Sequence, residues 1–395
     1  MQIYLDHSAT TPTRSEAIAA MHRVLASEWG NPSSIHQWGE RASTSIEQAR
    51  FQVAALINAN PDAISFTSGG TEANNQAIMG VANLYTTPQH LIISSVEHSS
   101  ISAPVQWLET RGWQVTRLAC DRSGSIKPED LATAIRPNTV LVSIVYAQSE
   151  VGTVQPIAEL AAICRQYQVY FHTDAVQAAG RISIDVQKLG IDLLSISSHK
   201  LYGPQGTGAL YIRPGLEIIP LLAGGGQEMG WRSGTQAVPQ IAGFGVAAEL
   251  ASEELASENL RLIGLRDRLF ELLADCPTLM PTGDLIHRLP HHLSFCLQIP
   301  SADRQEPITG KTIVRQLNLA GIGISSGAAC ASGKLTPSPI LLAMGYSKVD
   351  AVGGIRLTLG KSTTAADIDW SAMVLKQILD RLTPQLVISG TKIIS

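Results

Sequence analysis

The chain has 395 residues, of which 45% are hydrophobic and 16% are charged, and its formal net charge at pH 7 is −4. This composition is typical of a globular enzyme, and the length predicts two domains. The slightly acidic balance gives no indication of nucleic acid or an anionic membrane as a partner. The first residues lack a signal-peptide pattern, no apolar run is long enough to span a membrane, and five scattered cysteines favour a reducing cytoplasm.

Strand-like and helix-like segments alternate along the first half of the chain. Strands are expected at 64–68, 90–95, 139–147, 169–175 and 193–198, and helices at 72–84, 101–111 and 157–167. This alternation predicts an α/β fold with a mostly parallel central sheet covered on both faces. A long helical stretch at 247–274 precedes two further strands, near 292–298 and 355–359.

The stretch FTSGGTEANN, which begins at Phe66, combines a strand end, a glycine turn and a helix start. Amide groups at Gly69, Gly70 and Thr71, together with the Thr71 hydroxyl, would form a cup for a phosphate at the positive end of the helix. The alternative is an ordinary helix start, in which Ser68 or Thr71 is the N-cap.

Three polar residues lie at or just after the ends of predicted strands: Asp174, Gln177 and, at the end of another strand, His98. Asp174 ends an apolar strand, where ligands bind in open α/β sheets, and its carboxylate would be costly to bury without a cation such as a protonated pyridine nitrogen. Gln177 could donate to a ring hydroxyl, and His98 could stack on an aromatic ring or move a proton. The alternatives are a helix-capping aspartate and a structural histidine.

Lys200 stands in SISSHKLYGPQGTGALY, after a strand and before a glycine-rich run. Desolvation would lower its pKa, and the neutral amine could then form a Schiff base. Arg356 lies in the strand-like GGIRLTLG, where a buried guanidinium needs a partner such as a substrate carboxylate. An exposed lysine and a structural ion pair are the respective alternatives.

The run GISSGAACASGKLTPS, from Gly323, consists mostly of small residues around Cys330. We expect a mobile loop over about 323–336 that carries a reactive thiol. The other cysteines are interpreted as structural: Cys120, Cys164, Cys276 and Cys296.

A phosphate cup, an acid for a pyridinium nitrogen, a ring-stacking histidine, a Schiff-base lysine and a carboxylate-binding arginine together indicate pyridoxal phosphate with an amino acid substrate. The chain also resembles the cysteine desulfurases of the fold type I, class V aminotransferase group. The resemblance covers nearly the whole chain, in the family's order, and rests on YLDHSATTP, GNPSSIHQWG, SGGTEANN, HTDAVQ, SSHKLYGPQGTGALY, GGGQEMGWRSGT and SSGAACAS.

This resemblance implies a large cofactor-binding domain over 13–250 and a smaller α+β domain formed by 1–12 and 251–395. It implies that Lys200, Cys330 and His98 are catalytic and that Arg356 binds the substrate carboxylate. The implied cofactor-binding residues are Gly70, Thr71, His98, Ser149, Asp174, Gln177, Ser197, His199, Lys200 and Thr235. Ser149 stands where the family usually has asparagine. Thr235 corresponds to a phosphate ligand from the other subunit, which implies a homodimer.

The reaction implied by the resemblance converts L-cysteine to L-alanine and leaves the sulfur on Cys330 as a persulfide. An acceptor protein would then take the sulfur for iron–sulfur clusters or another sulfur-containing cofactor. The nearest alternatives are a selenocysteine lyase and a pyridoxal-phosphate-dependent C–S lyase. A non-catalytic dimeric scaffold is disfavoured, because a decayed site has no reason to keep Lys200, Asp174, Arg356 and Cys330 together.

Overall fold

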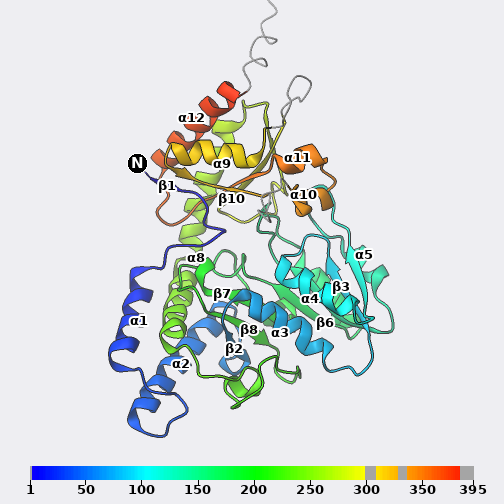
Figure 1. Ribbon diagram of the computed structural model, residues 1–395, viewed down its shortest axis with the longest axis vertical. Coiled ribbons are helices and arrows are strands. Elements are labelled where there is room, and N and C mark those ends of the chain that lie inside the picture. Colours follow the sequence, from blue (N-terminus) through cyan, green and yellow to red (C-terminus); the bar gives the residue numbers. More distant parts are fainter. Residues whose placement is uncertain (1, 299–307, 328–335, 383–395) are drawn as a thin grey trace, which may run out of the picture.

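The computed structural model describes residues 2–298, 308–327 and 336–382. Figure 1 shows a large sheet with its helices in the lower part of the view, the C-terminal elements in the upper part, and α8 running between the two. No helix in the described ranges is long and apolar enough to cross a membrane.

The large sheet has seven strands in the order β2-β8-β7-β6-β5-β3-β4, and β8 is the strand that runs antiparallel to its neighbours. The mostly parallel sheet expected from the sequence is therefore confirmed, although β4 and β8 were not predicted. The strands are β2 Ile64–Thr67, β3 His90–Ser94, β4 Gln114–Leu118, β5 Thr139–Val145, β6 Tyr170–Asp174, β7 Leu193–Ser197 and β8 Gly208–Ile212.

Two apolar layers cover this sheet, because successive strand side chains point to opposite faces. Ile92 packs in a core with residues of α1, α2, α6 and α8, whereas its neighbours Leu91 and Ile93 pack with α3 and α4. The helices of this part, with the short 3-10 turns between them, are α1 Ser15–Ser27, α2 Gln37–Leu56, η1 Pro61–Ala63, α3 Gly70–Ala82, α4 Ser99–Glu109, α5 Pro128–Ala134, α6 Ile157–Gln166, α7 Val186–Leu189, η2 Ser198–Lys200 and η3 Glu228–Gly230.

The C-terminal part is built on a four-stranded antiparallel sheet, in the order β12-β13-β10-β9, with its own apolar core. A short parallel pair joins β1 to β11, so the start of the chain lies beside this part. The elements are β1 Ile3–Tyr4, β9 Leu279–Pro281, β10 His292–Leu297, α9 Gly310–Leu319, β11 Ile322–Gly323, β12 Ser325–Ser326, α10 Pro339–Ala343, α11 Lys348–Val352, β13 Ile355–Thr358 and α12 Ala365–Leu382.

The long helix α8 spans Val238–Leu273, so the predicted start at 247 is wrong by nine residues. Pro239 lies in the first turn, where a proline is tolerated. Gly245 packs so closely on α2 that an added Cβ would lie 2.6 Å from Ala49 Cβ. The early glycines and proline thus serve packing and helix initiation rather than ending a helix. The domain boundary predicted at residue 250 falls inside α8 and stays a prediction.

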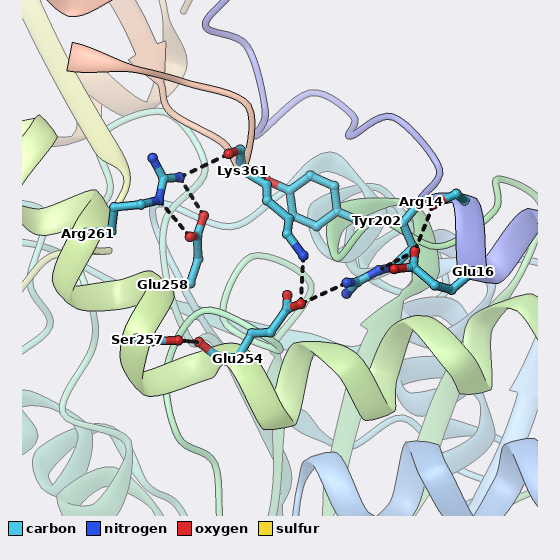
Figure 2. A network of polar contacts seen from close by, with 9 residues as sticks. Arg14, Glu16, Tyr202, Glu254, Ser257, Glu258, Arg261 and Lys361 are labelled. Carbon is cyan, nitrogen blue, oxygen red and sulfur yellow. Dashed lines mark hydrogen bonds and ion pairs between the residues drawn. The ribbon is translucent and has the colours of Figure 1, made fainter.

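A polar network, shown in Figure 2, connects α8 with segments from both parts of the molecule. Glu254 Oε1 accepts hydrogen bonds from Arg14 Nη2 at 3.0 Å and from Lys361 Nζ at 2.6 Å. The Lys361 amide donates to Tyr202 Oη at 2.8 Å. Tyr202 follows Lys200 by two residues, and Lys361 lies just beyond β13. The network therefore connects two segments that adjoin the candidate active site.

Candidate active site

A cavity of about 310 Å³ lies at the carboxyl ends of β5, β6 and β7, beside the first turns of α3 and α4. Parallel strands bring their carboxyl ends to one edge of a sheet, and ligands bind there in open α/β folds. Ten of the predicted site residues line this cavity: Gly70, Thr71, His98, Ser149, Asp174, Gln177, Ser197, His199, Lys200 and Arg356.

Asp174 is the last residue of β6 and is 4% exposed. Its Oδ2 accepts from Asn74 Nδ2 at 2.7 Å, and its Oδ1 accepts from the Val176 amide at 2.9 Å. Burial raises the pKa of the Asp174 carboxyl, whereas these two hydrogen bonds lower it. Both donors are uncharged, so among the described residues the carboxylate has no cation bonded to it.

Lys200 lies on a 3-10 turn directly after β7, in a half-buried position. Its Nζ donates to the carbonyl oxygens of Ser8 and Ala9, each at 2.7 Å. Burial, and secondarily the charge of Arg356, lowers the pKa of the Lys200 amine to about 8. A much larger fraction of this amine is therefore neutral at physiological pH than for an ordinary lysine, as the sequence predicted.

The first turn of α3 forms one wall of the cavity. An added Cβ at Gly70 would lie 2.6 Å from Val176 Cγ2, so a glycine is needed for this close approach. Thr71, Ser197 and His199 line the same cavity, and His199 Nδ1 lies 3.0 Å from Thr10 Oγ1. Burial lowers the pKa of His199 to about 4, so the ring is neutral at pH 7.

His98 is the N-cap residue of α4 rather than the end of a strand, and it lines the cavity. Its Nδ1 accepts from the Ser100 amide at 3.2 Å and lies 2.7 Å from Ser100 Oγ. Asn74 Nδ2 also donates to Ser100 Oγ, at 2.8 Å. Asn74 thus connects His98, through Ser100, with Asp174. The sequence interpretation missed Asn74, although it lies one turn after Gly70 on the same helix.

Arg356 is on β13, as predicted, but its guanidinium already has two partners. Nη2 forms an ion pair with Asp6 Oδ1 at 2.7 Å, and Nη1 donates to the Ser149 carbonyl at 2.9 Å. The ion pair that the sequence left as an alternative is therefore present. Ser149 lines the cavity, and its backbone carbonyl accepts this hydrogen bond from Arg356. Asp6 was not predicted as a site residue.

The remaining predicted residues differ in their relation to the cavity. Gln177 lines the cavity, and its Nε2 donates to the Ser8 carbonyl at 2.9 Å. Thr235 is exposed and does not line the cavity of this chain, so its role across a dimer stays a prediction. Cys330 and most of its loop lie outside the described residues.

The four described cysteines have the character of structural residues. Burial raises the pKa of the Cys120 and Cys164 thiols, that of Cys276 to about 11 and that of Cys296 to about 12. Each therefore stays protonated at neutral pH and is a poor nucleophile.

The described residues fit pyridoxal phosphate. The buried carboxylate of Asp174 would accept from a protonated pyridine nitrogen, which would supply its missing cation. Lys200 is placed to hold the aldehyde carbon, and the glycine cradle at the positive end of α3 suits the phosphate.

Comparisons with known proteins identify the family. The family model for aminotransferase class V matches residues 3–370. Cysteine desulfurase IscS of Dictyoglomus turgidum is 45% identical over 96% of this chain and 95% of its own length, and that of Methanosarcina thermophila is 43% identical over 96% and 92%.

Solved structures show the same similarity. A NifS-like protein, 34% identical, superposes with a TM-score of 0.89 over 96% of this chain and all of its own. SspA in complex with cysteine, also 34% identical, gives a TM-score of 0.79 over 91% of this chain and 99% of its own. The predicted fold type I architecture is thereby confirmed. The chain belongs to the class V aminotransferase family and, within it, to the cysteine desulfurases.

Proposed function

We propose that this cavity carries out the cysteine desulfurase reaction, with L-cysteine as substrate and L-alanine as product. Family membership gives the protein this activity and pyridoxal phosphate as its cofactor. The observation that carries the assignment of the site is that Asp174, Lys200 and Arg356 line one cavity. The cysteine held by the related SspA supports the choice of substrate.

Each residue of the site has a separate task. When bound, pyridoxal phosphate supplies an electron sink that stabilises negative charge at the substrate Cα. Asp174 keeps the pyridine nitrogen protonated, and Asn74 holds the carboxylate in place for this contact. Gly70, Thr71, Ser197 and His199 bind the phosphate. Arg356 binds the carboxylate of L-cysteine, because a guanidinium matches the geometry of that group.

Lys200 would hold the cofactor covalently and would then remove the proton from Cα of the substrate. Its lowered pKa suits both tasks, because each requires the amine in its neutral form. His98, which also lines the cavity, moves the proton of the Cys330 thiol.

Cys330 accepts the sulfur. Its thiolate attacks the substrate sulfur, and an S–S bond forms as the C–S bond breaks. The electron pair of the C–S bond stays on the substrate Cβ, which takes up a proton, and L-alanine leaves while the persulfide stays on the chain. The raised pKa values of the four described thiols favour this assignment, since none of them is an activated nucleophile.

Substitution of Cys330 tests the assignment. We expect Cys330→Ala to keep the cofactor and to bind L-cysteine, but to form L-alanine at least about a hundredfold more slowly, because one member of a catalytic unit is lost. Alanine and protein persulfide are measured during turnover. Cys276→Ala, which removes a partly exposed thiol elsewhere, is the control. Alanine formation by Cys330→Ala at the wild-type rate would falsify the proposal and favour a lyase route.

The protein acts as a homodimer in the cytoplasm and delivers sulfur to an acceptor protein that assembles iron–sulfur clusters or another sulfur-containing cofactor. Thr235 is exposed on a loop that two ion pairs anchor, the buried Arg50–Glu228 pair at 2.7 Å and the partly buried Arg232–Glu72 pair at 2.9 Å. A fixed and exposed hydroxyl is suited to reach the phosphate of a partner subunit.

Mixed dimers test this shared site. A Lys200→Ala chain combined with a Thr235→Ala chain regains one intact site if Thr235 serves the partner. Activity of isolated heterodimers above that of either parent homodimer is the expected result. If Thr235 instead serves its own chain, each site of this heterodimer carries one of the two substitutions, and its activity does not exceed that of the parents.

A further inference from the structure

The ion pair between Asp6 and Arg356 is not part of the reaction described above. Asp6 Oδ1 lies 2.7 Å from Arg356 Nη2, and both side chains are largely shielded, with 19% and 12% of their surfaces exposed. Arg356 also lines the cavity. An arginine that is to receive a substrate carboxylate therefore already bonds a carboxylate of its own chain.

The backbone fixes this arrangement. Asp6 forms an isolated parallel bridge with Thr358, two residues along β13 from Arg356. The Asp6 carbonyl accepts from the Ala9 amide at 3.0 Å and from Tyr4 Oη at 2.9 Å. The carboxylate is thus held beside the guanidinium by the register of two chain segments, and the contact is not a chance encounter of two flexible side chains.

Two of the three nitrogen atoms of the Arg356 guanidinium already have hydrogen-bond acceptors. Nη1 donates to the Ser149 carbonyl and Nη2 to Asp6, while Nε is buried and has no partner among the described residues. Both ways in which a guanidinium can hold a carboxylate through two parallel hydrogen bonds use Nη2, the atom that already bonds Asp6. Two carboxylates on one guanidinium would also repel each other.

We propose that Asp6 is a positioning residue that holds and neutralises Arg356 until the substrate carboxylate displaces it. This inference rests on the proposed role of Arg356 as the carboxylate clamp. The exchange of one carboxylate for another keeps the charge of the shielded guanidinium balanced in both states. A ligand without a carboxylate cannot make this exchange, so its affinity should not depend on Asp6.

The test is a comparison of two ligands that differ only in the carboxylate. L-alanine and ethylamine are titrated into the holoenzyme by calorimetry, for the wild-type chain and for Asp6→Asn, which keeps the shape of the side chain. Removal of the competing charge should lower the Kd for L-alanine on the order of tenfold and leave the Kd for ethylamine unchanged. Asp6→Ser is the second variant, in case the first does not fold.

Control variants separate this inference from the assignment of Arg356. Asp192→Asn breaks an ion pair with the more exposed Arg213, away from the cavity lining, and should change neither Kd. An unchanged or raised Kd for L-alanine in Asp6→Asn, or an equal change for both ligands, would overturn the inference. If Arg356→Gln raises the Kd for L-alanine in the same titration, the proposed role of Arg356 in binding the carboxylate stands and only the exchange with Asp6 is wrong. If Arg356→Gln leaves the Kd for L-alanine unchanged, both the role of Arg356 and the exchange are wrong.

Discussion

The cofactor end and the substrate end of the cavity are assembled in different ways. At the cofactor end, Asp174, Ser197 and Lys200 come from the ends of two adjacent strands, β6 and β7, within 27 residues of one another. At the substrate end, Arg356 meets Asp6, which is 350 positions away, and the carbonyl of Ser149. The first end is thus a property of one sheet, whereas the second exists only where three distant segments meet.

This difference predicts how the two ends respond to substitution. Loss of a group at the cofactor end should remove the chemistry itself, because the cofactor is held and activated there. Loss of a group at the substrate end should mainly change which ligands bind and how tightly.

The largest effect is expected for Lys200→Ala. Turnover should fall by roughly a thousandfold or more, because both covalent attachment of the cofactor and removal of the Cα proton depend on this amine. Borohydride reduction followed by peptide mapping should place the cofactor on Lys200 in the wild type and on no residue in the variant. Lys188→Ala, which changes an exposed lysine, is the control. A label on another lysine would show that the assignment is wrong.

Arg356→Gln should have the next largest effect, and chiefly on KM. Loss of a charged partner of a carboxylate in a shielded site should raise the KM for L-cysteine by about 30-fold or more, with a smaller change in kcat. Steady-state kinetics at saturating cofactor measure both constants. Arg268→Gln, which breaks an exposed pair with Asp369, is the control. A fall in kcat with no change in KM would place Arg356 at the cofactor end instead.

Asn74→Ala should have the smallest effect of the three. Its amide donates to Asp174 Oδ2, and loss of a hydrogen bond to a charged group should lower kcat on the order of tenfold. Because this bond lowers the pKa of the carboxyl, its removal raises that pKa, and the acid limb of the pH profile should move to higher pH. Asn75→Ala, on the same helix, removes bonds to backbone carbonyls only and should leave the acid limb in place. If the acid limb does not move in Asn74→Ala, Asn74 does not influence the pKa of Asp174 that governs activity.

Prediction from the sequence was most complete where the signals are local. The strand that ends at Asp174 and the strand that precedes Lys200 are apolar runs, and the glycine turn before α3 is explicit in SGGTEANN. The cavity gathers ten of the predicted residues. Errors arose where packing overrides local preference. The start of α8 was misplaced because glycines that allow close contact with α2 resemble helix breakers when only the sequence is read.

The sequence by itself determined the family, the alternating α/β pattern and the chemical types of the groups in the site, since these depend on residue identity and short-range periodicity. The tertiary structure decided the partners of those groups. Only the folded chain brings Asn74 to Asp174, the carbonyls of Ser8 and Ala9 to Lys200, and Asp6 to Arg356. The physical reason is that pairing at a site depends on distance in space, and the register between remote strands and segments sets that distance without leaving a periodic signal in the sequence.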